Sequence, residues 1–183
     1  MPQPVAHPFT RMGVAENLAG LQAVTFDPRS GIQGNAALTA GQIVLFEIFA
    51  AESFLCSSIW AAVAGTAGVT LTNCFAGLYD DTGTLIGVTA DQSSQWTSTG
   101  VKQMSLVTPV MLQNGRRYYV ALLVGSAATL PNFSRGATVP ALNAGSAAPF
   151  RSSTFGSGLT ALPATIAFGS AAANSTAWWG ALS

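Results

Sequence analysis

The stretch of residues 74–124 constrains the fold most, because it is a series of short apolar runs separated by strong turn signals. Its first two runs, residues 75–79 and 84–88, flank the tetrapeptide Asp80-Asp81-Thr82-Gly83. An Asp can hold such a turn through the backbone, and Gly adopts a positive φ without steric cost. This segment therefore predicts a β-hairpin.

The second half of the stretch predicts more strands. Thr108-Pro109 separates two apolar runs and indicates a bend or an edge crossing, because proline cannot donate to a central ladder. Asn114-Gly115 indicates a further hairpin corner, and residues 118–124 are apolar on both faces, as in a central strand. Strands with turns about every ten residues predict an all-β fold, an antiparallel sandwich that resembles a jelly roll.

The remaining strands fit one domain. Residues 43–49 and 54–64 predict long strands, with Glu47 on an outer face, and residues 165–168 and 177–182 predict two closing strands. We expect residues 1–35 to form an extended arm with a first short strand at 21–26. Residues 36–183 then form the sandwich, with a long Ala-, Ser-, Gly- and Pro-rich loop excursion at about 126–157.

Charge is scarce: 8% of the residues are Asp, Glu, Lys or Arg, against about 25% in ordinary soluble domains. Subunit interfaces are depleted in charge, so the composition favours a surface that faces other subunits. All seven acids lie in residues 1–91 with two of the seven bases, and the other five bases follow, so the halves carry −5 and +5. Either these charges mix on one sandwich, or complementary patches orient one subunit against the next.

Several classes are disfavoured by the sequence. The longest uncharged run considered, residues 53–79, is interrupted by Ser, Gly, Thr and Asn, so we expect no membrane insertion. Arg116-Arg117 is the only adjacent basic pair, which argues against nucleic acid as a partner. Cys56 and Cys74 are expected to be buried free thiols, because no export signal is recognised before them.

The sequence predicts no enzyme, no metal and no cofactor. His7 is the single histidine and lies among prolines, so a Ser-His or Cys-His pair would need that segment to reach the core. Asp80, Asp81 and Asp91 bracket one hairpin and could converge on calcium, but no twelve-residue loop with alternating acids supports such a site.

Trp96 is the leading candidate for a contact with glycan, with Tyr79 as a second. Trp96 is one large ring in the polar segment 91–100, an arrangement suited to stacking on a sugar. Packing of the ring over the end of the sandwich explains the same pattern.

The N-terminal segment is the candidate assembly arm. It contains several prolines and no sustained helical or strand period, so it is expected to lean on a neighbouring subunit. The residues proposed for this contact are Pro2, Pro4, His7, Pro8, Phe9 and Arg11.

The succession AGLYD, DDTG, TADQSSQWTSTG, VKQMSL, TPVMLQNGRRYYVALLV and terminal WWGALS resembles a β-sandwich module of tail-associated and other virion proteins of phages infecting actinobacteria. The resemblance covers about residues 36–125 and the last strand, and its motifs are strand and turn patterns. It implies a non-enzymatic virion structural protein, assembled in the host cytoplasm, that forms a homo-oligomer with other virion proteins as partners. A trimer is the favoured state.

Three hypotheses follow from these features. The first is a tail, baseplate or fibre subunit that contacts the host surface. The second is a capsid decoration or head-fibre protein. The third is a carbohydrate-binding module that recognises a cell-surface glycan through Trp96 and Tyr79.

Overall fold

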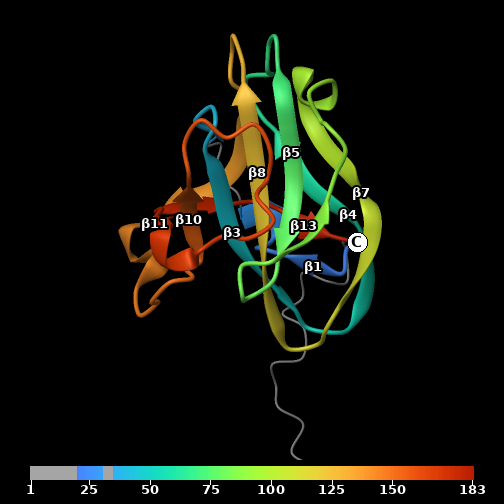
Figure 1. Ribbon diagram of the computed structural model, residues 1–183, viewed down its shortest axis with the longest axis vertical. Coiled ribbons are helices and arrows are strands. Elements are labelled where there is room, and N and C mark those ends of the chain that lie inside the picture. Colours follow the sequence, from blue (N-terminus) through green and yellow to red (C-terminus); the bar gives the residue numbers. More distant parts are fainter. Residues whose placement is uncertain (1–19, 31–34) are drawn as a thin grey trace, which may run out of the picture.

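The computed structural model describes residues 20–30 and 35–183. They form two antiparallel β-sheets, which confirms the all-β sandwich predicted from the sequence. Figure 1 shows β3, β8 and β5 side by side, with β7 along the right-hand margin of the molecule. The candidate arm, residues Pro2 to Arg11, lies outside the described residues.

The first sheet has six strands in the order β11-β10-β3-β8-β5-β6. Its strands are β3 (Ile43–Ala50), β5 (Thr72–Tyr79), β6 (Leu85–Val88), β8 (Arg116–Ser126), β10 (Ser152–Phe155) and β11 (Ala172–Ala173).

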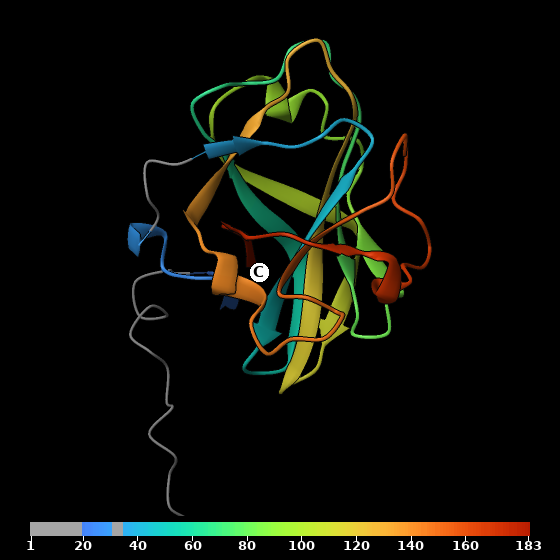
Figure 2. The same ribbon diagram turned by 90° about the vertical axis from the view of Figure 1, so that its left-hand side faces the viewer.

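The second sheet follows the order β1-β13-β4-β9-β12, with β2 added to β9 and β7 added to β4. Figure 2 shows β2, in blue, beside β9, in orange. The strands are β1 (Ala23–Val24), β2 (Asn35–Ala37), β4 (Phe54–Val63), β7 (Gly100–Leu112), β9 (Asn132–Thr138), β12 (Thr176–Trp178) and β13 (Ala181–Leu182). Short 3₁₀ turns connect strands at η2 (Pro28–Ser30), η3 (Gln95–Thr97), η4 (Pro140–Asn143) and η5 (Phe168–Ser170).

Strand β8 is central and buried on both faces, as its sequence predicts. It pairs with β3 on one side and with β5 on the other. Val120, Leu122 and Val124 point into the core between the sheets. Tyr119, Ala121 and Leu123 point the other way, into a second apolar cluster that includes Ile166 and Phe168. The segment before β11 therefore covers the outer face of the first sheet.

The predicted hairpin at residues 75–88 is confirmed as β5 and β6. Asp80 holds the turn, because its Oδ1 accepts hydrogen bonds from the backbone N–H of Thr82 at 2.9 Å and of Thr84 at 3.0 Å. Gly83 takes a φ of +85° there.

Asn114-Gly115 is a turn but not a hairpin corner, so that prediction is wrong. The strands on either side of it lie in different sheets: β7 pairs with β4, whereas β8 pairs with β3 and β5. The local turn signal was correct, but it carries the chain from one sheet to the other. Thr108-Pro109, by contrast, lies in edge strand β7 at a register shift against β4, as predicted.

The excursion at 126–157 contains more structure than its composition predicts. β9 joins β2, β4 and β12 in the second sheet, and β10 pairs with β3 over residues Ser152–Phe155. Tertiary pairing outweighs the weak strand propensity of this Ala- and Ser-rich segment.

The predicted end strands are shorter than expected. The first is β1, of two residues, and residues 177–182 divide into β12 and β13. Thr165 makes only an isolated bridge to Thr84, and Phe168 begins η5.

Both cysteines are buried free thiols, as expected. They lie on β4 and β5, which belong to different sheets, and not on neighbouring strands. Burial raises the pKa of the Cys56 thiol to about 11. The thiolate is the reactive form, so this environment suppresses the reactivity of Cys56.

We expect Gly83→Ala to destabilise the protein more than Gly115→Ala. Both glycines have positive φ, +85° and +74°, and a left-handed non-Gly residue costs about 1–2 kcal/mol. At Gly83 an added Cβ would also lie 2.1 Å from the Ile166 carbonyl oxygen, whereas at Gly115 no atom lies within 4 Å. Overpacking should add about 1–3 kcal/mol at Gly83 alone. Denaturant unfolding of both variants measures the difference, and equal losses would contradict this account.

Candidate assembly surface and adjoining groove

Four large apolar side chains stand exposed on the outer face of β4 and β7. Their exposed fractions are 58% for Leu55, 61% for Val101, 68% for Val107 and 53% for Met111. Leu55 and Met111 are direct partners in the register of the two strands, and Val101 lies opposite Ala62. We call these four residues the β4–β7 surface.

Strand alternation produces this surface. Met104, Leu106 and Leu112 of β7 are buried in the core, so Val101, Val107 and Met111, at odd positions, face outward. Between Cys56 and Ser58 of β4 the partner residue on β7 changes from Val110 to Ser105, so β7 forms a bulge that includes Val107.

β7 is also an edge strand. It pairs along its length with β4, and on its other side, where β6 packs nearby, the described β-pairing is a single bridge between Leu106 and Thr89. Much of its outer backbone is therefore open to pairing with another chain, a liability that folded proteins usually reduce with charged side chains. Lys102 is the only charged residue in β4 or β7, and its Nζ donates to Ser98 Oγ at 2.8 Å.

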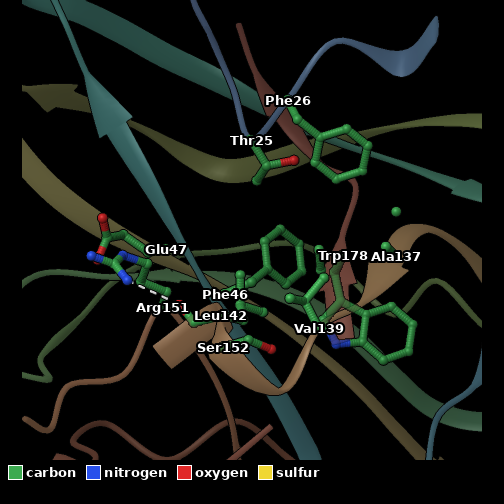
Figure 3. Close-up of a pocket in the computed structure, with 12 residues that line it drawn as sticks. Thr25, Phe26, Phe46, Glu47, Ala137, Val139, Leu142, Arg151, Ser152 and Trp178 are labelled. Atoms are coloured by element: carbon green, nitrogen blue, oxygen red, sulfur yellow. Dashed lines mark hydrogen bonds between the residues drawn. The ribbon is translucent and has the colours of Figure 1, made fainter. Parts of the chain in front are cut away.

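A groove of about 440 Å³ lies elsewhere on the molecule. Figure 3 shows its two ends: Phe26 and Trp178 lie toward one, and Glu47 and Arg151 lie at the other. Phe46 is 2% exposed and Trp178 4%, so both form its floor, whereas Val139 is 40% exposed at the rim. The other lining residues are Thr25, Gly136, Ala137, Leu142, Ser152 and Ala177.

The two charges of the groove are held by local contacts. The Glu47 backbone N–H donates to the Arg151 carbonyl at 2.8 Å, which fixes the two residues side by side. The Glu47 carboxylate lies 3.8 Å from Arg117, and Arg151 Nη1 donates to the Leu142 carbonyl at 2.9 Å. Among the described residues, no ion pair within 4.0 Å involves Arg151. The groove is thus apolar at one end and carries a carboxylate and a guanidinium at the other.

Trp96 is not available for stacking on a sugar, which corrects the prediction for this residue. Its side chain is 0% exposed. The ring meets Phe133 edge to face, with centroids 5.0 Å apart, and its Nε1–H points at Met104 Sδ at 3.3 Å. Trp96 closes one end of the sandwich core, the packing alternative that the sequence also allowed.

Tyr79 is likewise buried, with 0% exposure. Its hydroxyl donates to the Pro163 carbonyl at 2.7 Å, and burial raises the pKa of the phenol. Tyr79 therefore anchors the segment before β11 to the first sheet and does not form a glycan contact.

The acidic residues considered for calcium have separate roles. Asp80 holds the β5–β6 turn, and Asp81 pairs with Arg116 at 3.2 Å. Asp91 accepts from the backbone N–H of Ser93 at 2.8 Å and of Cys74 at 3.2 Å. Within residues 20–30 and 35–183, no cluster of three His, Cys, Asp or Glu side chains is placed to bind a metal.

No helix in the same part of the chain has the length and apolar content to cross a membrane.

Sequence reasoning missed both the β4–β7 surface and the groove. The alternation of β7 would have revealed the outward apolar positions once Pro109 was accepted inside one long strand. The groove had no local signal, since its lining comes from β3, β9, η4 and the segment after β1, which are distant in sequence.

No protein-family model and no curated protein matches this sequence.

We expect Trp96→Ala to lower the free energy of unfolding by about 3–5 kcal/mol, the range for removing a fully buried aromatic side chain. Val107→Ala, at an exposed position, should change it by less than about 0.5 kcal/mol. Denaturant unfolding compares the two variants. A Trp96→Ala protein that kept its free energy of unfolding but lost adsorption to bacterial cell walls would restore the glycan hypothesis.

Acid should destabilise the protein in part through Asp91. Burial alone would raise the pKa of Asp91, but hydrogen bonds from the Ser93 side chain and from the backbone of Ser93 and Cys74 hold it below 3.8. A carboxyl group with a lowered folded pKa stabilises the fold above its unfolded pKa, and this stability is lost as the pH falls through the folded value. Asp91→Asn should therefore flatten the pH dependence of unfolding in the acid range. An unchanged profile would show that the lowered pKa of Asp91 contributes nothing to the acid dependence of stability.

Proposed function

We propose that this chain is a non-enzymatic structural subunit of a phage virion. In this proposal it is a tail, baseplate or fibre protein that assembles with copies of itself through the β4–β7 surface. The observation that carries the proposal is the outward apolar pairing of Leu55 with Met111 on a sheet whose edge strand is open.

The chemistry of this surface supports assembly between protein subunits. Four exposed apolar side chains on two neighbouring strands resemble an interface core, where charge is depleted and Met is enriched. Exposed apolar side chains that lie side by side on a soluble protein, as Leu55 and Met111 do, commonly mark an interaction site. The low charge of the whole chain, 8%, supports the same use of its surface.

A second copy of this chain is the proposed occupant of the surface. Lys102 is the only charged residue of β4 and β7, so the surface offers little to a charged partner, and an equally apolar surface matches it best. An open edge strand can also pair antiparallel with the same edge of another copy, which would satisfy the backbone of both. The strand and turn pattern that resembles phage virion modules supports placing this assembly in a virion.

Met111→Glu should weaken self-association. A charge placed opposite Leu55 in a desolvated contact should cost at least about 2 kcal/mol, or roughly thirtyfold in the dissociation constant. Light scattering over a dilution series measures the mass, and we expect an oligomer for the natural protein and smaller species for the variant.

Val69→Glu is the matched control. Val69 is 52% exposed, close to the 53% of Met111, but lies outside β4 and β7. It should leave the oligomer intact. A monomeric natural protein, or equal effects of the two variants, would count decisively against the β4–β7 surface as the contact.

A further inference from the structure

We propose that the groove between Phe26 and Arg151 receives the N-terminal segment, residues 1–19, of a neighbouring copy. This inference rests on the proposed function and names a second contact between subunits. It places the assembly arm, which the sequence left without a partner surface, against a specific set of side chains.

The position of the groove is the first argument. The described chain begins at Gly20, and Thr25 and Phe26 line the groove only a few residues later. In β1 the chain runs alongside β13: the Thr25 N–H donates to the Gly180 carbonyl, and the Gln22 N–H donates to the Leu182 carbonyl. Going back from Phe26 toward Gly20, the described chain therefore leaves the groove, and we assign the filling of the groove to a neighbouring copy.

The chemistry of the two partners is the second argument. The groove presents aromatic and aliphatic side chains, with Phe26, Phe46 and Trp178 among them. Residues 1–10 carry no charged side chain and include Pro2, Pro4, Pro8 and Phe9. Proline-rich segments dock into aromatic-lined grooves, because their extended geometry costs little entropy on binding.

Charge complementarity is the third argument. The groove ends in Glu47 and Arg151. The first two charged side chains of the chain are Arg11, opposite in sign to Glu47, and Glu16, opposite in sign to Arg151. With residues 1–10 over the aromatic end, Arg11 would follow toward Glu47. The alternative pairing would place like charges together and is disfavoured by their repulsion.

Photo-crosslinking in the full chain tests the proposal. A photoreactive residue at Val139, on the exposed rim, should crosslink to residues 1–11, which trypsin releases as one peptide ending at Arg11. Unlabelled and ¹⁵N-labelled proteins are mixed at a dilution that favours monomers and then concentrated. If the contact is between copies and the two isotopes mix at random in equal amounts, about half of the crosslinks should join a light peptide to a heavy one. The same photoreactive residue at Val69 is the control and should give none to residues 1–11.

A charge exchange tests the register. Glu47→Arg and Arg11→Glu should each lower the Val139 crosslink yield about two- to fivefold, as expected for an exposed ion pair, and the double variant should restore it. The restoration separates this pairing from the effect of Glu47→Arg on Arg117.

The outcomes are distinct. Crosslinks confined to one isotope would place the segment in its own copy and overturn the proposal. Crosslinks from Val139 to other segments, or no crosslinks at all, would also overturn it. A photoreactive residue at Val107 reports the β4–β7 surface independently. Crosslinks between copies at Val107 without any at Val139 would leave the proposed function standing and reject the groove contact, whereas their absence at both positions would reject both.

Discussion

The burial of β8 on both faces is the constraint on which the rest of the structure depends. Seven consecutive residues, from Tyr118 to Val124, are buried. Their side chains alternate between the two faces of the sheet, so each face must be covered by an apolar layer. One layer is the second sheet, which closes the sandwich core. The other is the segment around Ile166 and Phe168, where the Phe168 ring packs 4.7 Å from that of Tyr119. Without that cover, an apolar sheet face would be exposed to water.

Covering this second face also shapes the groove. To reach the outer face of the first sheet, the chain leaves the second sheet after β9, passes through η4 and returns as β10 beside β3. The hydrogen bonds of Asn143, whose side chain donates to the Ser152 carbonyl at 2.9 Å and to the Asn174 carbonyl at 2.8 Å, hold this return in place. The groove is the space left between β9 with η4 on one side and β3 on the other. Its position thus follows from the same requirement that buries β8.

The sequence predicted what local patterns determine. Residues 118–124 gave a correct central strand because both of their faces are apolar, and Asp80 to Gly83 gave a correct hairpin because the turn is satisfied by its own side chains. Asn114-Gly115 misled, since a turn signal does not say whether the flanking strands pair with each other or with different sheets. β9 and β10 were missed because Ala, Ser and Gly have weak strand propensity, and only their partners order them. Trp96 also misled, because its polar neighbours in sequence suggested an exposed ring. In the structure it is buried by Phe133, which is remote in sequence, and by Met104, which lies on the next strand.

The two proposed contacts differ in symmetry. Pairing of one β4–β7 surface with the same surface of another copy is isologous and ends with two subunits, whereas an arm that enters the groove of the next copy is heterologous. A heterologous contact must either close into a ring or continue as a filament. In the proposed assembly, a closed ring of three would fill each groove with an arm, and the β4–β7 surfaces would pair one ring with another. A trimer would therefore follow more directly from the proposed arm contact, which is heterologous, than from the isologous pairing of the β4–β7 surface.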